Sequence, residues 1–275
     1  MAVELRDVWF RYERDGADVL RGTTLTVPEG SLFAVVGGNG TGKSTMLRAI
    51  CGVARPYRGK ITVLGRRLKE WKKAELFRGG VALLPQDPLS LMVKKTVRGD
   101  LEEMLDGRGL AAEQRAAAVG EVATLTDIAP LLDAHPFDLS GGEVQRAALA
   151  KVLLCEPRLL AIGWNSSVLL GDPRLLLLDE PTKGLDAFFK DKLARLLRSL
   201  TARGTTVLMV SHDVEFCASY ADWCALFFDG NVVTTNPPRQ FFASNSFYTT
   251  AANRISRGFF ENVVTVEEVV ELCRS

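Results

Sequence analysis

Residues 37–45 read Gly-Gly-Asn-Gly-Thr-Gly-Lys-Ser-Thr and fit the pattern G-x-x-x-x-G-K-[ST]. In this pattern the glycines let backbone N–H groups approach phosphate oxygens, while Lys43 reaches the β and γ phosphates and Ser44 ligates Mg²⁺. The apolar stretch 31–36 predicts a short buried strand before the loop, and residues 45–51 predict a helix whose N-terminus faces the anion. The stretch therefore predicts a nucleoside triphosphate site made of Gly37, Gly38, Asn39, Gly40, Thr41, Gly42, Lys43, Ser44 and Thr45.

Two acidic residues far downstream suit the same site. Asp179 and Glu180 end a run of four leucines, 175–178, which predicts a strand buried on both faces, as in a parallel sheet. Ligands of such sheets bind at the carboxyl edge, where one acid can hold Mg²⁺ through water and the other can orient or deprotonate an attacking water. Taken alone, the acidic pair followed by proline is also compatible with a simple strand-ending turn.

Further stretches, in a fixed order, indicate a family. Residues 139–143 read Leu-Ser-Gly-Gly-Glu, and the whole chain resembles the nucleotide-binding subunit of ATP-binding cassette (ABC) transporters, for which this signature is specific. Tyr12 falls where that family stacks an aromatic ring on adenine, and Gln86 matches its Q-loop glutamine. Asp186, after Leu185, matches the D-loop, and His212 matches the switch histidine. A lone histidine or tyrosine is more often structural, so the order of the motifs carries the resemblance.

The resemblance implies an α/β fold: a P-loop NTPase (RecA-like) core with an N-terminal antiparallel β subdomain and an inserted α-helical subdomain. It implies ATP hydrolysis with Mg²⁺, in which Glu180 polarises water and His212 contacts the γ-phosphate. The implied catalytic residues are Glu180, His212, Lys43 and Gln86, and the implied Mg²⁺ ligands are Ser44, Gln86 and, through water, Asp179. The implied nucleotide contacts also include Tyr12, Asp186 and, from the opposite subunit, Ser140, Gly141, Gly142 and Glu143. A monomer should therefore be nearly inactive.

Composition limits the remaining classes. The 275 residues are 47% hydrophobic, which is ample for a core, and the net charge of +1 gives no sign of a nucleic-acid surface. Five cysteines without close paired spacing argue against zinc and fit a reducing compartment. We find no signal peptide and no apolar run of the roughly 20 residues that span a bilayer. We therefore expect a peripheral protein on the cytoplasmic face of the cell membrane, with the membrane path in other chains.

The chain divides into regions of different character. We expect an ATPase domain over 1–235, strand-rich up to residue 86 with hairpins near Gly16, Gly30 and Gly65. A helical subdomain is expected over about 87–155, and strand–helix alternation resumes at residue 175. Residues 236–275 should form a C-terminal helical extension. Its valine-rich end would be a dimerisation helix or, equally, a helix that caps the core.

An internal repeat lies between the signature and the acidic pair. Residues 152–160 recur as 168–176, an offset of 16, and removing 159–174 joins the two motifs as the family normally shows them. We expect this tandem duplication to be an extra helix or loop, with Trp164 and Asn165, away from the phosphates. Alternatively, residues 159–162 would take the sheet position of the 175–178 strand and abolish hydrolysis.

The tail from Pro237 to Arg254 and the Thr-Lys-Gly before Leu185 resemble the ATPases of energy-coupling factor (ECF) importers. This implies a second ATPase subunit, an integral-membrane coupling subunit and a substrate-binding membrane subunit, importing a vitamin or a transition-metal ion. The alternatives are the ATPase of another ABC importer or exporter and, less favoured, a non-transport ABC ATPase. The substrate and the choice between homodimer and heterodimer stay open. A basic cluster over 55–73 is interpreted as a solvated face, with acidic lipid headgroups as the alternative.

Overall fold

A six-stranded sheet forms the centre of the computed structural model, which describes residues 1–78, 80–154, 174–245 and 247–274. In spatial order its strands are β10 (Asn231–Asn236), β9 (Trp223–Phe228), β3 (Leu32–Val36), β8 (Thr206–Val210), β7 (Leu175–Asp179) and β6 (Val81–Leu84). All neighbouring pairs are parallel except β9 and β10. Because parallel strands end at the same edge, the segments after β3, β7 and β8 meet there.

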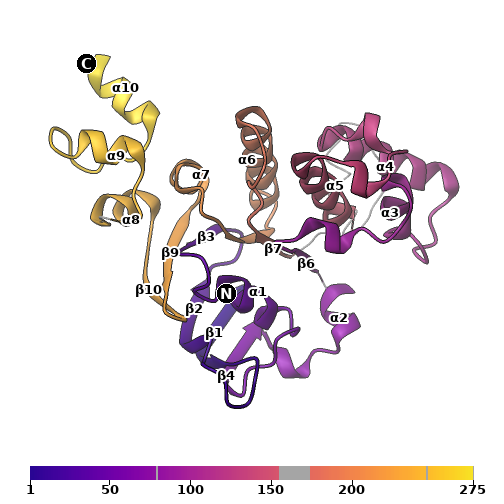
Figure 1. The fold of residues 1–275 in the computed structure, drawn as a ribbon, viewed down its shortest axis with the longest axis horizontal. Coiled ribbons are helices and arrows are strands. Elements are labelled where there is room, and N and C mark those ends of the chain that lie inside the picture. The colour runs from indigo at the N-terminus through magenta and orange to yellow at the C-terminus, as the bar shows by residue number, and fades with distance from the viewer. Residues whose placement is uncertain (79, 155–173, 246, 275) are drawn as a thin grey trace.

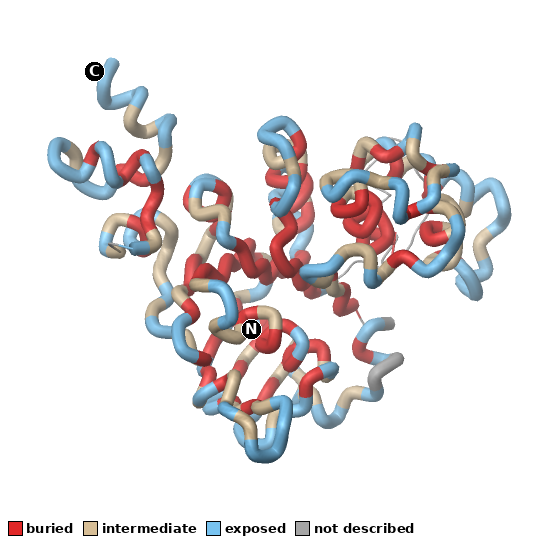
Figure 2. Tube along the Cα trace, in the orientation of Figure 1, coloured by how far each residue is buried: buried red, intermediate tan, exposed pale blue. Residues whose placement is uncertain are grey.

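The central strands are buried on both faces, as the sequence predicts. Every residue of β3, β7 and β8 is buried. Along β3, Leu32, Ala34 and Val36 belong to one apolar core, whereas Phe33 and Val35 belong to the other. Figure 2 shows this buried interior running through the middle of the molecule. Such a sheet needs cover on each side, and the helices and the second sheet provide it.

The second sheet is antiparallel, in the order β2 (Leu20–Val27), β1 (Val3–Phe10), β4 (Arg58–Val63) and β5 (Arg66–Arg67). The hairpins expected near Gly16 and Gly65 are confirmed, since β1 pairs with β2 and β4 with β5. The hairpin expected near Gly30 is wrong. At Gly30 the chain passes from β2 in the antiparallel sheet to β3 in the central sheet. Because β3 is buried on both faces, it pairs within the central sheet and not with β2.

Helices are inserted between the strands. The helices before β7 are α1 (Lys43–Ile50), α2 (Lys73–Arg78), α3 (Val97–Glu103), α4 (Ala112–Leu125) and α5 (Gly141–Leu154). Between β7 and β9 lie α6 (Ala187–Thr201) and α7 (Val214–Tyr220). Short 3-10 helices are η1 (Leu68–Glu70), η2 (Pro88–Leu91), η3 (Ala129–Leu131) and η4 (Pro136–Asp138). Figure 1 shows α3, α4 and α5 grouped on one side, apart from α1. The exact limits of a helical subdomain, 87 and 155, stay a prediction.

The predicted duplication, including Trp164 and Asn165, lies outside the described residues apart from Arg174. Beyond it, β7 is built from residues 175–179 and lies between β6 and β8. Asp179 and Glu180 therefore stand at the strand end. The alternative in which residues 159–162 take this position differs from the arrangement that the structure shows.

Three short helices end the chain: α8 (Pro238–Ser244), α9 (Ala251–Ser256) and α10 (Val266–Arg274). The α10 side chains are not buried, and Val266 and Val270 are 57% and 40% exposed. The interpretation of this helix as a core cap is therefore wrong, and its role in dimerisation stays a prediction. Figures 1 and 2 show α10 projecting from the molecule with an exposed surface. Among the described residues, no helix combines the length and apolar character of a bilayer span.

Candidate active site

The phosphate loop joins the end of β3 to the start of α1. Gly42 directly precedes α1 with a φ of 108°, and a Cβ on it would lie 2.7 Å from the Val19 carbonyl oxygen. A Cβ on Gly37 would lie 2.2 Å from the Phe227 carbonyl oxygen. Both distances are below any real contact, so only glycine permits this backbone path. The first α1 amides and the positive end of its dipole are thereby directed at the loop, as phosphate binding requires.

Lys43 is held inside the loop. Its Nζ donates to the carbonyl oxygens of Gly37 and Gly38, at 2.9 and 2.6 Å, and the side chain is buried. Burial lowers the pKa of Lys43, while the negative charges of Glu180 and Asp179 act against this shift. The two acids and the lysine therefore share one electrostatic site, as the sequence predicts.

Asp179 ends β7 and faces the helix that follows the loop. Burial raises the pKa of Asp179, whereas a hydrogen bond from the Ser44 side chain and the charges of Arg48 and Lys43 lower it. Its Oδ1 is buried and accepts no hydrogen bond from the described residues. A buried carboxylate oxygen without a donor, beside a serine hydroxyl, is a donor set that suits a hard divalent cation or its bound water.

Glu180 follows with a strained backbone. Its φ is 56°, in the left-handed region that few residues other than glycine adopt, and such strain is concentrated at functional sites. The conformation is fixed on both sides, because the Glu180 amide donates to the Val210 carbonyl oxygen at 2.9 Å and its own carbonyl accepts from Lys183. The turn thus directs the side chain toward the segment that follows β8.

His212 lies in that segment, beside Glu180. The His212 amide donates to Glu180 Oε2 at 3.2 Å, and His212 Nε2 lies 3.2 Å from Glu180 Oε1. Burial raises the pKa of Glu180, and the hydrogen bond from His212 and the charge of Lys43 act against the rise. Burial and the charge of Lys43 lower the pKa of His212, which favours the neutral imidazole. An ionisable carboxylate and a neutral imidazole next to Lys43 can orient a water and a phosphate oxygen.

Gln145 supports this turn and was not identified from the sequence. It is buried in α5, and its Nε2 donates to the carbonyl oxygens of Glu180 and Pro181 at 3.3 and 3.4 Å. The signature helix is thereby bonded to the turn that carries Glu180. Gln145 follows Val144 in the predicted helix, but nothing local in the sequence indicates that its amide reaches the Glu180 turn.

The signature residues lie at the start of α5, with Ser140 just before its first residue, and not at the phosphate loop of the same chain. Glu143 Oε2 accepts from the Ser140 amide at 2.8 Å and from its hydroxyl at 2.6 Å, and these bonds hold the pKa of Glu143 below its usual range. Glu143 therefore caps its own helix. A Cβ on Gly142 would lie 2.6 Å from the Gly184 carbonyl oxygen, so the signature packs backbone to backbone on the segment before Asp186.

The other predicted contacts are placed as follows. Tyr12 is 59% exposed, and its hydroxyl lies 2.9 Å from Thr45 Oγ1 near the start of α1. Gln86 is exposed after β6. Asp186 accepts from the Phe189 amide at 2.7 Å and caps α6. The Tyr12 ring is thus open for stacking, whereas the Asp186 carboxylate has a structural role.

Tyr248, from the C-terminal extension, approaches the loop unexpectedly. Its hydroxyl would lie 3.4 Å from a Cβ on Gly38. The segment is held by Asn245, whose Oδ1 accepts from the Tyr248 amide at 3.0 Å, and by Glu215, which accepts from the Ala251 amide at 2.7 Å. Nothing in the sequence pattern indicated that these two residues, 210 positions apart, approach each other.

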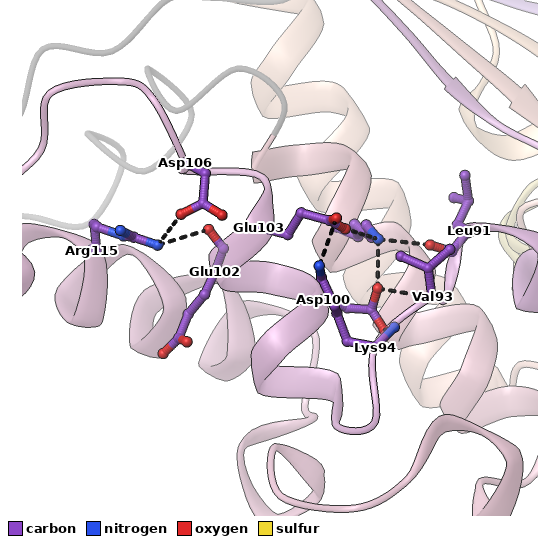
Figure 3. A network of polar contacts seen from close by, with 9 residues as sticks. Leu91, Val93, Lys94, Asp100, Glu102, Glu103, Asp106 and Arg115 are labelled. Carbon is purple, nitrogen blue, oxygen red and sulfur yellow. Dashed lines mark hydrogen bonds and ion pairs between the residues drawn. The ribbon is translucent and has the colours of Figure 1, made fainter.

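A buried ionic network fixes α5 to the segment that follows Gln86 and η2 (Figure 3). Lys151 Nζ lies 2.6 Å from Asp100 Oδ1 and donates to the Leu91 carbonyl oxygen at 2.7 Å. Asp100 is fully buried and also accepts from the Val93 amide at 3.0 Å. The segment after Gln86 is therefore tied to the signature helix.

Comparisons with known proteins agree with this geometry. A family model described as "ABC transporter" matches residues 20–162, and one described as an AAA domain matches residues 136–218. The energy-coupling factor transporter ATP-binding protein EcfA of Methanocaldococcus jannaschii is 30% identical over 256 residues, covering 93% of this chain and 86% of the relative. The protein of the same name in Methanothermobacter thermautotrophicus is 31% identical, covering 93% and 77%.

Other relatives are longer. A Bacillus cereus protein assigned as an ABC transporter ATP-binding protein is 36% identical over 96% of this chain, which spans only 44% of that relative's length. Among solved structures, cbiO1 of Clostridium perfringens, part of the transporter complex cbiONQ, has a TM-score of 0.73 at 23% identity, covering 100% and 99% of the two chains. A dimeric bacterial ABC transporter cassette has a TM-score of 0.73 at 24% identity, covering 86% and 98%. The structural neighbours establish the fold, and the family model and the relatives establish the family.

Proposed function

Because the chain belongs to the ABC transporter family and carries an ABC-type ATPase domain, we propose that it hydrolyses ATP to drive the import of a small solute in a transporter of the energy-coupling factor type. The observation that carries the proposal is the convergence of Lys43, Asp179 and Glu180 at the end of the central sheet. A lysine, a cation-binding acid and a water-orienting acid are the parts that phosphoryl transfer to water requires.

The residues of the loop would hold the nucleotide. Lys43 is already directed at the loop carbonyls and would exchange these acceptors for the β and γ phosphate oxygens. The exposed Tyr12 ring would stack on adenine, since its hydroxyl is fixed by Thr45. The residues proposed to contact the triphosphate are Gly37, Gly38, Asn39, Gly40, Thr41, Gly42, Lys43, Ser44 and Thr45.

Ser44, Gln86 and, through water, Asp179 would hold Mg²⁺, whose role when bound is to neutralise phosphate charge. The orphaned buried Oδ1 of Asp179 beside Ser44 fits this assignment. Asp179 itself would keep that water in place and would not touch the reacting phosphorus.

Glu180 and His212 would prepare the attacking water. The raised pKa of Glu180 makes its carboxylate a stronger base than an exposed glutamate, and it would accept a hydrogen bond from the water or remove its proton. His212, neutral because its pKa is lowered, would donate to the γ-phosphate and keep Glu180 in position. Gln145 would act as a positioning residue through the Glu180 backbone.

The site would be completed by a second ATPase subunit. Gly141 and Gly142 begin α5 directly after Ser140, and this helix lies apart from α1 within one chain (Figure 1). A second subunit would bring the corresponding helix N-terminus to the γ-phosphate, where its amides favour an anion. Glu143 would hold that N-terminus in shape, and Asp186 would do the same for the adjoining α6.

The energy-coupling assignment is supported by relatives named EcfA in two archaea, of which this chain covers most of the length. On this basis we propose as partners an integral-membrane coupling subunit and a substrate-binding membrane subunit, with the chain bound peripherally on the cytoplasmic face. The transported vitamin or metal ion would not contact this chain. The ATPase of another ABC importer or exporter is the second candidate, because one longer relative is assigned only as an ABC transporter ATP-binding protein.

Affinity purification of the tagged full chain from detergent-solubilised cells tests the proposal. We expect integral-membrane proteins to co-purify and the complex to hydrolyse ATP, with Lys43→Ala abolishing hydrolysis but not assembly. Lys95→Ala, which removes an exposed cation outside the phosphate loop, is the matched control. Recovery of nucleic acid instead, released steeply by salt, would refute the transport assignment.

A further inference from the structure

The basic cluster of residues 55–73 divides into two groups in the structure. Arg58 Nη2 lies 2.7 Å from Asp7 Oδ2, and Arg66 Nη1 lies 2.6 Å from Glu75 Oε1, so these two cations are neutralised. Four others have no ion pair or hydrogen bond of their side chains within the described part of the chain: Arg55, Lys60, Arg67 and Lys69. The cluster is therefore largely exposed, but only some of its cations have a charged partner.

All four of these cations line one cavity, of about 650 Å³. It lies between the C-terminal end of α1, strand β4, the short helix η1 and Leu76 of α2. Among the residues that the structure describes, no acidic side chain lines it. Asp7 and Glu75 are already paired with Arg58 and Arg66. Glu70, next to Lys69 in η1, is exposed and does not line the cavity.

The floor of the cavity is apolar. Cys51, Ile61 and Leu76 are buried there, and the Trp71 ring contributes beside them. Trp71 is fixed by its Nε1, which donates to the Val63 carbonyl oxygen at 3.4 Å, and by the Arg66 guanidinium, 4.8 Å from the ring centroid. Burial raises the pKa of Cys51 to about 12, so its thiol stays protonated and acts as a small apolar group.

The cavity is distinct from the phosphate loop. The loop precedes α1, whereas Cys51 and Gly52 follow it, and the eight residues of the helix separate the two by about 12 Å. A nucleotide at the loop would leave these four cations without a counter-charge. The volume lies within the range of small-molecule sites, about 300–1,000 Å³.

We propose that this cavity binds a soluble organic anion, an apolar or aromatic body that carries a phosphate, sulfonate or carboxylate group. The anionic group would meet Arg55, Lys60, Arg67 and Lys69 at the rim, and the apolar body would cover the floor beside Trp71. Neither an inorganic anion nor a neutral apolar molecule uses both features. The proposal goes beyond ATP hydrolysis and does not depend on it.

Fluorescence titration of the full chain with 8-anilinonaphthalene-1-sulfonate tests it, because this probe joins an aromatic body to one anionic group. The titration is performed with a saturating non-hydrolysable ATP analogue, which occupies the phosphate loop. We expect saturable binding with one probe per chain. N-phenyl-1-naphthylamine, the same ring system without the charge, should bind about 10-fold more weakly.

The variant Lys60→Gln/Arg67→Gln should weaken the sulfonate about 10-fold and leave the neutral probe unchanged. The charge-preserving variant Lys60→Arg/Arg67→Lys should restore binding. Lys95→Gln/Arg203→Gln, which removes two exposed cations elsewhere, should have no effect. Circular dichroism checks that each variant is folded.

Three results would overturn the proposal. One is displacement of the sulfonate by the ATP analogue, which would place the probe at the phosphate loop. Another is equal binding to wild type and Lys60→Gln/Arg67→Gln. The third concerns vesicles: the protein sediments with phosphatidylglycerol but not with phosphatidylcholine vesicles, and Lys60→Gln/Arg67→Gln loses this binding but still binds the sulfonate. That result would assign the cations to a membrane surface.

Discussion

Replacing Lys151 by methionine should be among the most destabilising single changes in the helical group α3–α5. Lys151 Nζ lies 2.6 Å from Asp100 Oδ1, and the exposed fractions of the two side chains are 8% and 0%. Methionine retains the apolar stem but removes the ammonium group. The Asp100 carboxylate would then be buried without a counter-charge.

The expected loss of unfolding free energy depends on the hydrogen bonds that Asp100 would keep. Removing one partner of a buried ion pair costs about 3–5 kcal/mol. Asp100 still accepts from the amides of Val93 and Lys94, at 3.0 and 3.3 Å, so we expect the lower end of that range, about 3 kcal/mol. Adding Asp100→Asn removes the uncompensated charge, and the double variant should recover at least about 1 kcal/mol of the loss.

Urea denaturation followed by circular dichroism measures the free energy of unfolding. The control is Lys190→Met, because Lys190 Nζ lies at the same distance, 2.6 Å, from Asp213 Oδ2, but its side chain is 36% exposed. That change should cost no more than about 1 kcal/mol. The reasoning is refuted if the two single variants lose the same free energy, or if Asp100→Asn adds to the loss of Lys151→Met.

Three further predictions concern the site. Gly42→Ala should destabilise the fold by about 1–3 kcal/mol and abolish ATP binding measured by calorimetry. The reason is that the new Cβ would lie 2.7 Å from a backbone oxygen, at a φ of +108°. An unchanged ATP affinity would contradict this. Gln145→Ala should remove the donor of the Pro181 carbonyl and one of the two donors of the Glu180 carbonyl, cost about 1–3 kcal/mol and lower kcat more than it changes KM. A change in KM alone would argue against a positioning role. In NMR titration of the two histidines, the His212 midpoint should lie below 6.5 and rise in Lys43→Ala, because burial and that charge lower it. Because its pKa is lower in the folded than in the unfolded state, His212 stabilises the fold above pH 6.5, and this stabilisation is lost as the pH falls below 6.5. A His212 midpoint at or above 6.5 would contradict the assignment.

The fold was predictable where one physical signal dominated. The all-apolar stretches 32–36, 175–178 and 207–210 identified the central parallel strands, because strands covered on both faces lack polar alternation. The turn at Gly30 was misinterpreted because glycine marks a chain reversal but does not say whether the next strand pairs with the previous one.

The site was predictable only in part, because local sequence patterns do not show which distant segments come into contact. Lys43 and Glu180 carry motifs whose chemistry depends on residues close together in the sequence. Gln145 and Tyr248 act through contacts between distant segments, 35 residues apart for Gln145 and Glu180, and no local pattern encodes them. Likewise, the basic cluster could be counted from the sequence, but only the structure separates Arg58 and Arg66, which are paired, from the cations that line the cavity.

The central claim is that Glu180 prepares water for attack on a nucleotide held by the phosphate loop. The most direct measurement is the steady-state ATPase rate of the purified complex with Glu180→Gln, together with the ATP that the complex retains after gel filtration. We predict a rate at least about 100-fold lower with ATP retained, because the amide cannot accept the proton, and an unchanged rate in Glu261→Gln, the same change at an exposed carboxylate. A rate for Glu180→Gln equal to that of the wild type would contradict the account.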